Sequence, residues 1–300
     1  MAGVIVEGVD GSGKTTLIKY LRNRTFWPVC HVVQPHQPNV TQMFELAACA
    51  PMIFDRFHLS PVAYGKALRS GPELGPYDLW GIEGFLMGRG YITIWCNTQP
   101  RLMVQNNRKE EQLWEEVRDL EKMKTLISCY QEALHASELP YTLYDYLVDD
   151  PENVISAASV VPALPLGLVG ASKPLTWVVG DEKQQTREGV MEYVPFFTPG
   201  VGHQLLSGTL LQRSMAKINW RWQWTTLSNS AINGAVAPLR EWYELLGKPK
   251  RVVALGGEAA ERLDRAEIPN HRVTHPQAKR RFAHRTCEAD YPEELKHATL

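Results

Sequence analysis

Short apolar runs alternate with stretches of helical periodicity over the first half of the chain. Such alternation predicts a parallel sheet with helices on both faces, because each strand reaches the next through a crossover helix. The expected strands are 4–6, 29–33, 52–54, 91–96 and 142–144, and the expected helices are 15–23, 61–69, 76–87 and 110–136.

A second alternating set follows a stretch rich in proline, glycine and small residues. That stretch has no helical periodicity but is still apolar, so we interpret it as a packed interdomain linker. We therefore expect an α/β protein with a first domain over 1–160, a linker over 161–174 and a smaller α/β domain over 175–300. Within the smaller domain the expected strands are 175–180, 222–230, 250–257 and 270–276, and the expected helices are 236–246 and 257–265.

The composition is that of an ordinary globular protein, with 44% hydrophobic and 22% charged residues among 300. A chain of this length suggests about two domains. No apolar run is long enough to span a membrane, and no basic segment with a cleavage site opens the chain. The five cysteines include no C-x-x-C pair, which argues against a disulfide scaffold and a zinc site. We expect a reduced, cytoplasmic protein.

The small net charge of −1 hides an asymmetry between the two halves. Residues 1–160 carry 14 Lys and Arg against 19 Asp and Glu, whereas residues 161–300 carry 18 against 14. The segment 272–285 is rich in arginine, lysine and histidine and contains no acid. This segment is either a binding surface for a polyanion such as DNA or a solvated basic face.

Residues 8–15, GVDGSGKT, fit the phosphate-loop pattern G-x-x-x-x-G-K-[ST] between a strand and a helix. Backbone N–H groups of such a loop bind phosphate oxygens, so we expect ATP as a ligand. Lys14 is expected to reach the β- and γ-phosphates, and Thr15 to hold Mg²⁺. The full set of expected ATP-binding residues is Gly8, Gly11, Ser12, Gly13, Lys14, Thr15 and Thr16.

An acid and an arginine, Asp55 and Arg56, follow the strand expected at 52–54. Ligands of parallel sheets bind at this carboxyl edge. Asp55 is expected either to orient the attacking group or to contribute to the Mg²⁺ shell, and Arg56 to hold the transferred phosphate. The alternative for the pair is a structural ion pair.

The stretches VEGVDGSGKTT and DRFHLSPVAYG resemble the thymidylate kinase family, and the similarity extends over roughly residues 3–155. The resemblance implies phosphoryl transfer from ATP to a thymidine-type nucleotide, with Asp10, Asp55 and Arg56 near the acceptor. The phosphate loop contains no arginine, although the transition state requires cations. Arg108 and Lys109, in the stretch similar to that family's lid, are the candidates, unless they merely begin a solvated helix.

The segment between Pro38 and Asp55 has only 16 residues, where the family builds the wall of its acceptor pocket. One short helix fits there, and Phe44 either stacks on a base or belongs to the core. A more open acceptor site either impairs acceptor binding or admits a larger acceptor, such as a nucleotide within DNA.

Several pieces of residues 175–286, including VPFFTPGVGHQLLSGTLL, TTLSNSAIN and HRVTHP, resemble the uracil-DNA glycosylase superfamily more distantly. The resemblance implies that Phe196 or Phe197 stacks on a base, that Asn229 reads its edge, and that His275 stabilises an anionic uracil. Basic residues, among them Arg280 and Arg281, would then hold DNA phosphates. The first loop lacks the family's Ala-Pro-Gly turn, which argues against water activation by Asp181 or Glu182. Core packing and strand-end capping are the structural alternatives for Phe196, Phe197 and Asn229.

We therefore expect an ATP- and Mg²⁺-dependent phosphotransferase that acts on a pyrimidine deoxynucleotide, with 5-hydroxymethyluracil in DNA as the favoured acceptor. One alternative is an ordinary dTMP kinase that acts on the free nucleotide. A second is a base-excision glycosylase with a regulatory ATP-binding half, and a third is an ATP-gated DNA-binding scaffold. No membrane partner is expected, and oligomerisation is left open.

Overall fold

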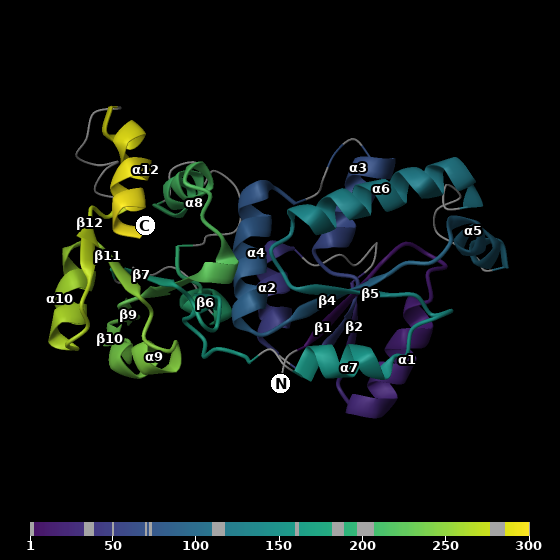
Figure 1. The fold of residues 1–300 in the computed structure, drawn as a ribbon, viewed down its shortest axis with the longest axis horizontal. Coiled ribbons are helices and arrows are strands. Elements are labelled where there is room, and N and C mark those ends of the chain that lie inside the picture. The colour runs from purple at the N-terminus through teal and green to yellow at the C-terminus, as the bar shows by residue number, and fades with distance from the viewer. Residues whose placement is uncertain are drawn as a thin grey trace. The chain divides into compact units, whose positions relative to one another are not determined.

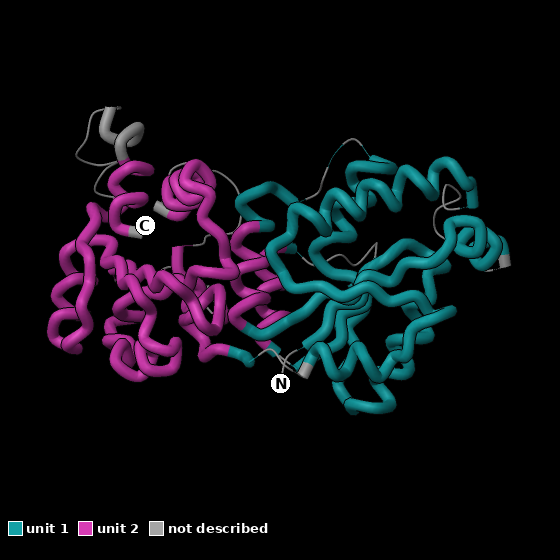
Figure 2. The backbone as a smooth tube through the Cα atoms, in the orientation of Figure 1, with its two compact units in different colours: residues 1–39, 49–79, 89–163 teal, residues 40–48, 80–88, 164–300 magenta. Residues whose placement is uncertain are grey.

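A computed structural model describes residues 3–32, 39–49, 51–69, 71, 74–109, 118–159, 162–181, 189–196, 207–276 and 286–299. The described part of the chain contains two five-stranded sheets, each with its own helices (Figure 1). Contacts divide the chain into two compact units, drawn in different colours in Figure 2. Unit 1 comprises residues 1–39, 49–79 and 89–163, and unit 2 comprises 40–48, 80–88 and 164–300. None of the described helices combines the length and the apolar character needed to cross a lipid bilayer.

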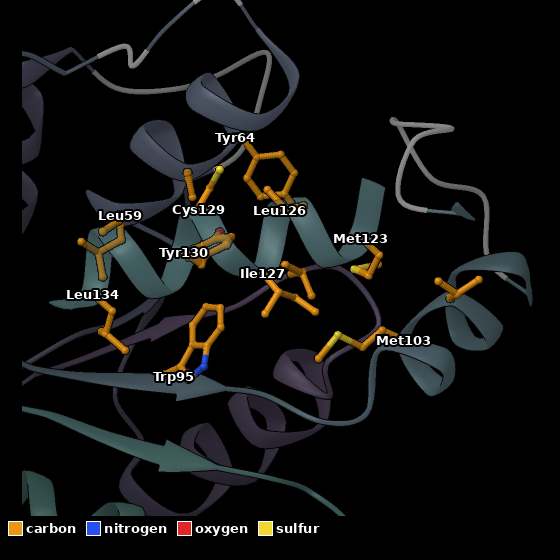
Figure 3. Packing of buried hydrophobic residues seen from close by; sticks show 14 residues of the cluster. Leu59, Tyr64, Trp95, Met103, Met123, Leu126, Ile127, Cys129, Tyr130 and Leu134 are labelled. Carbon is orange, nitrogen blue, oxygen red and sulfur yellow. The ribbon is translucent and has the colours of Figure 1, made fainter. Parts of the chain in front are cut away.

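Unit 1 contains an entirely parallel sheet with the strand order β2-β3-β1-β4-β5. Both faces of its central strand β1 are covered, because apolar side chains alternate toward two helical layers. One layer is α1 and α7, and the other is α3, α5 and α6, whose apolar side chains pack around Trp95 and Tyr130 (Figure 3). The strands are β1 (Val4–Glu7), β2 (Val29–His31), β3 (Ile53–Asp55), β4 (Ile92–Cys96) and β5 (Tyr141–Tyr144). The helices are α1 (Lys14–Thr25), α3 (Leu59–Leu68), α5 (Pro100–Lys109), α6 (Leu120–Ala136) and α7 (Glu152–Ser159).

The strands and the first helices predicted for this half are confirmed, with small differences at their ends. The long helix predicted over 110–136 is wrong at its start, because α6 begins only at Leu120. Asp119 is its N-cap: the Asp119 carboxylate accepts the backbone N–H of Lys122, so the helix starts after this residue. The segment 110–117 lies outside the described residues, and α5 and α7 were not predicted from the periodicity.

Unit 2 contains a sheet with the order β12-β11-β7-β8-β6, in which β6 alone runs antiparallel to its neighbour among the described strands. Its strands are β6 (Val169–Gly170), β7 (Thr176–Gly180), β8 (Thr225–Asn229), β11 (Arg251–Leu255) and β12 (His271–Val273). A two-residue pair, β9 (Ala231–Ile232) and β10 (Ala235–Val236), forms a separate hairpin. The helices are α8 (Ser207–Lys217), α9 (Leu239–Leu245), α10 (Gly257–Arg265) and α12 (Thr286–Thr299), together with α2 (Val40–Ala48) and most of α4 (Pro76–Gly88).

Three tryptophans alternate with polar residues at 220, 222 and 224, but the strand expected at 222–230 does not include its first three residues. Residues Trp222–Trp224 form a 3₁₀ helix, and the strand begins at Thr225. The indole N–H of Trp222 donates to the carbonyl of Trp80 (3.0 Å), and the two rings lie 4.8 Å apart. Packing of a buried indole on α4 therefore overrides the local alternation.

Two segments expected in the linker or the first domain contribute to the core of unit 2. Leu164 and Leu168 are buried in one cluster with Trp177 and Trp242, and β6 lies within the predicted linker. Phe44 on α2 is fully buried, 5.2 Å from the ring of Phe85. Of the two interpretations of Phe44, the structure therefore shows core packing.

Candidate functional site

The phosphate loop connects the end of β1 to the start of α1, at the carboxyl edge of the sheet. Gly11 and Gly13 have positive φ angles of 78° and 92°, a region that residues with a side chain rarely adopt. A Cβ atom on Gly11 would lie 2.5 Å from the carbonyl oxygen of Met103, and one on Gly13 would lie 2.6 Å from the ring of Tyr146. The loop conformation therefore depends on glycine at both positions.

Three residues that the sequence did not single out hold the loop from the side of α5 and β5. The side-chain amide of Asn107 donates to the carbonyl of Asp10 (3.0 Å), and that of Asn106 donates to the carbonyl of Gly11 (3.0 Å). Asn106 also donates to the hydroxyl of Tyr146 (3.4 Å). Two consecutive asparagines near the end of a helix are the only local signal, and such a pair does not indicate what it binds.

Lys14, the first residue of α1, is buried and its ammonium lies inside the loop. Its Nζ donates to the carbonyl of Val9 (2.7 Å). Burial and the nearby charge of Arg56 lower the pKa of Lys14, while Asp10 and Asp55 act in the opposite direction. A phosphate at the N-terminus of α1 would offer this ammonium anionic oxygens in place of a carbonyl. The side chains of Thr15 and Thr16 are exposed in the first turn.

Asp10, Arg56 and Tyr64 form a cluster beside the loop. The Arg56 guanidinium pairs with one carboxylate oxygen of Asp10, and the hydroxyl of Tyr64 donates to the other (2.9 Å). Arg56 also lies over the Tyr64 ring, 4.9 Å from its centroid. Burial acts to raise the pKa of Asp10, but Arg56, Lys14 and Tyr64 outweigh it and hold that pKa below its ordinary value. The structure thus brings a cation to the loop although the loop itself contains no arginine.

Asp55, the last residue of β3, pairs with a histidine that the sequence interpretation missed. His31 of β2 is the register partner of Asp55, and its Nδ1 lies 2.8 Å from the Asp55 Oδ2. The other carboxylate oxygen, Oδ1, is buried and has no hydrogen-bond partner among the described residues. A histidine at the end of a strand is the only signal that the sequence offers for this contact.

The expected Mg²⁺ ligands are compatible with the ion in their chemistry. Mg²⁺ prefers oxygen ligands, and Thr15 offers an exposed hydroxyl while the unpartnered Oδ1 of Asp55 offers a carboxylate oxygen. Within the described part of the chain, no group of three or more His, Cys, Asp and Glu side chains is arranged to bind a metal ion. Mg²⁺ usually keeps several waters and binds phosphate oxygens in addition to one or two protein oxygens.

The lid candidates lie at the end of α5. Arg108 directly follows the two asparagines that hold the loop. It is exposed and donates to the carbonyl of Arg118 (3.5 Å). Lys109 ends the same helix, and its side chain lies outside the description. A cationic role for either residue remains a prediction.

In unit 2, the carboxyl edge of the sheet brings together the aromatic, amide and imidazole side chains proposed to recognise a base. Asn229 ends β8, and His275 follows β12. A Cβ atom on Gly180, at the end of β7, would lie 2.2 Å from Cζ of Phe196 and 3.0 Å from Oδ1 of Asn229. The rings of Phe196 and His275 are 6.2 Å apart. The candidates Phe197, Glu182, Arg280 and Arg281 lie outside the described residues.

A cavity of about 410 Å³ opens beside this group. Burial lowers the pKa of His275, although the charges of Asp181 and Glu258 act to raise it. The imidazole is therefore biased toward its neutral form at pH 7. The cavity is lined by Asp181, Gly256, Gly257, Arg272, Val273, Thr274, His275 and Glu294.

Asp181 has a structural role in this arrangement. Its Oδ1 accepts the backbone N–H of Ala259 (2.7 Å), so the carboxylate caps the N-terminus of α10. A Cβ atom on Gly256 would lie 2.3 Å from the same carboxylate, which shows how closely the backbone surrounds it. One oxygen of this acid is thus engaged with α10, while Asp181 also lines the cavity.

No protein-family model matches the sequence, and no curated protein does. Solved structures match about half of the chain. The YorR protein of Bacillus subtilis, in complex with phosphorylated GDP, is 19% identical with a TM-score of 0.44, and the match covers 51% of this chain and 91% of YorR. Deoxyadenosine kinase of M. mycoides with bound dATP is 14% identical with a TM-score of 0.39, covering 53% of this chain and 100% of the kinase. The same enzyme with bound dCTP is 15% identical with a TM-score of 0.38, and the match covers 53% of this chain and 100% of the kinase. The first half of the chain is similar to these P-loop nucleotide kinases, and these matches do not identify unit 2.

Proposed function

We propose that this protein transfers the γ-phosphoryl group of ATP to a thymidine-type pyrimidine deoxynucleotide. The observation that carries the proposal is the cluster at the carboxyl edge of unit 1. There the phosphate loop, the buried Lys14 ammonium and the Arg56 guanidinium meet beside the carboxylates of Asp10 and Asp55. Two cations next to an anion-binding loop match the charge that a transferring phosphoryl group spreads over its oxygens.

In this reaction an acceptor oxygen forms a bond to the γ-phosphorus while the bond to the bridging oxygen of ADP breaks. Lys14 and the N-terminus of α1 bind the β- and γ-phosphates, and Arg56 binds the phosphoryl group as it moves. The unpartnered oxygen of Asp55 orients an acceptor hydroxyl and accepts its proton. Mg²⁺, held through the Thr15 hydroxyl, would neutralise phosphate charge; Asp55 would join the Mg²⁺ shell only in place of its role as the base. Arg108 would add a further cation.

The favoured acceptor is a hydroxyl on a modified thymine in DNA, such as 5-hydroxymethyluracil. Phe44 is buried in the core of unit 2, so it does not serve as a stacking wall for a free nucleotide. Phe196 and Asn229 meet at Gly180, Phe196 lies beside His275, and His275 lines a cavity. Stacking combined with reading of a base edge is how flipped bases are recognised. We therefore propose a glycosylase-like base-binding role for unit 2, with Arg280 and Arg281 as contacts to DNA phosphates.

Binding of a base without excision is supported by Asp181. A glycosylase has to direct a water to the sugar carbon, whereas the Asp181 carboxylate accepts a helix N–H at 2.7 Å. The excision alternative would have to use the remaining oxygen of Asp181 or a different acid. The dTMP kinase alternative requires a stacking residue other than Phe44, whose ring is buried against Phe85.

The deciding experiment is transfer of label from γ-labelled ATP to dTMP, to unmodified DNA and to DNA containing hydroxymethyluracil, each assayed separately. We expect label in the modified DNA and its loss in Lys14→Ala. Label in dTMP alone would exclude the DNA form of the proposal. Release of free base from uracil-containing DNA that persists in Lys14→Ala would support the excision alternative instead.

A further inference from the structure

Glu7, the last residue of β1, is fully buried. The hydrogen bonds of its carboxylate go to the turn after β3 and not to the phosphate loop. Its Oε1 accepts the backbone N–H groups of Phe57 (2.9 Å), Leu59 (3.2 Å) and Ser60 (3.4 Å). Its Oε2 accepts the hydroxyl of Ser60 (2.5 Å). A buried charge of this kind is tolerated because four donors surround it.

The three amides belong to the turn that begins α3. The residue before this helix, His58, makes no side-chain cap, so the first N–H groups of α3 receive their acceptor from β1. A carboxylate is favourable at this position because the N-terminus of a helix carries partial positive charge. Glu7, on strand β1, therefore caps the N-terminus of α3.

This cap fixes the backbone on one side of Arg56. Arg56 has φ 65°, a left-handed conformation that is costly for a residue with a long side chain. Its own N–H donates to the carbonyl of Val6 (2.9 Å), and the next N–H, that of Phe57, donates to Glu7. Consecutive residues of β1 thus hold both peptide groups around Arg56, and the turn directs its guanidinium to Asp10 and Tyr64.

The same network reaches α6. The hydroxyl groups of Ser60 and Tyr130 are 2.6 Å apart, and the Tyr130 ring is buried between α3 and Trp95 (Figure 3). Burial and the charge of Glu7 raise the pKa of Tyr130, so its hydroxyl stays protonated and can donate. The helix that carries Tyr130 is thereby tied to the turn that presents Arg56.

We propose that Glu7 is a positioning residue for phosphoryl transfer: through the start of α3 it holds Arg56 in the left-handed conformation that presents the guanidinium beside the phosphate loop. The proposal rests on the phosphoryl transfer inferred above. It assigns to Glu7 no contact with either substrate.

The test is a double-mutant cycle between Glu7→Gln and Arg56→Lys, with label transfer as the assay. Glutamine keeps the volume and one acceptor oxygen but removes the charge that holds the three amides. A displacement of about 1 Å at a reacting group costs up to roughly 100-fold in rate, so we expect kcat to fall about 10- to 100-fold in Glu7→Gln. KM for ATP is expected to stay within about twofold, because the loop and Lys14 are unchanged. In the Arg56→Lys background the same substitution is expected to change kcat less than about twofold.

Equal fold losses of kcat in both backgrounds would overturn the proposal, because Glu7 would then act independently of Arg56. An NMR measurement of the Arg56 guanidinium signals gives a second readout that needs no turnover. We expect these signals to shift and broaden in Glu7→Gln and to stay unchanged in the control Glu83→Gln, which alters a buried acid on α4 in unit 2. Unchanged Arg56 signals in Glu7→Gln would likewise overturn it. Absence of transfer by the wild-type protein would refute the proposed function, and the NMR result would still decide the role of Glu7.

Discussion

Gly180→Ala is the sharpest perturbation of the base-recognition cluster, because its effect follows from one distance. The added Cβ would lie 2.2 Å from Cζ of Phe196. Non-bonded carbon atoms approach to about 3.5 Å, so the ring has to retreat by roughly 1.3 Å. The backbone of Gly180 cannot yield, since it pairs with Leu255 and Asn229 on both sides and accepts the N–H of Ser230 (2.8 Å).

Overpacking of this kind costs about 1–3 kcal/mol of folding free energy. We expect urea denaturation to show a loss within that range. If Phe196 stacks on the acceptor base, kcat/KM for hydroxymethyluracil DNA should also fall, by up to about 100-fold, because the stacking surface is displaced by more than 1 Å. The Kd for ATP should not change, since the phosphate loop belongs to unit 1.

The matched control is Gly75→Ala, whose Cβ would be 3.4 Å from the Asp78 carboxylate, an ordinary contact. The double variant Gly180→Ala with Phe196→Ala removes the clash, so its loss of stability should be smaller than the sum of the single losses. Unchanged stability in Gly180→Ala would show that the ring does not pack on Gly180. Reduced stability with unchanged activity on DNA would show that Phe196 does not contact the acceptor.

Three further predictions concern other parts of the chain. Asn107→Ala removes a hydrogen bond to the loop carbonyl of Asp10 worth about 1 kcal/mol, so the free energy of unfolding should fall by at least about that amount and KM for ATP should rise by up to about fivefold as the loop loses its support; an unchanged KM would contradict a role in holding the loop. Trp222→Ala should lower the free energy of unfolding by about 3–5 kcal/mol in urea titrations followed by fluorescence, because it removes a buried indole and its bond to the Trp80 carbonyl; Trp222→Phe should lose less. The folded-state pKa of His275 is lowered, so the folded protein resists protonation. The free energy of unfolding should be highest above the unfolded-state pKa of His275, about 6.5. It should fall as the pH decreases from there, until the pH passes below the folded-state pKa. His275→Asn should flatten that slope between pH 5 and 7, and an unchanged slope would assign it to other groups.

The strand–helix alternation and the phosphate loop follow from the sequence because both depend on local chemistry. Five parallel strands formed where apolar runs occur, and glycines in the loop have the positive φ angles that only glycine adopts readily. The order of the strands was not predictable from the pattern, because pairing joins residues that are distant in the chain. His31 and Asp55, 24 residues apart, meet only because β2 and β3 are neighbours in register.

The contacts that give the candidate site its character were likewise decided by tertiary structure. The sequence named Asp10, Asp55, Arg56 and Lys14, but nothing local shows that Arg56 would pair with Asp10. In the sequence, Glu7, the buried acid that supports this pair, is simply one polar residue at the end of an apolar strand. Its role becomes visible only when the turn before α3 is folded against β1.

The sequence by itself determined that this protein has a phosphate loop between a strand and a helix, two α/β regions and a basic second half. Tertiary structure alone decided that α2 and most of α4 pack in unit 2, that Asp181 caps α10, and that Phe196, Asn229 and His275 share one sheet edge. The physical reason is the range of the interactions. Glycine torsions and hydrophobic periodicity act over a few residues, whereas caps, ion pairs and core contacts form between segments that only the complete fold brings together.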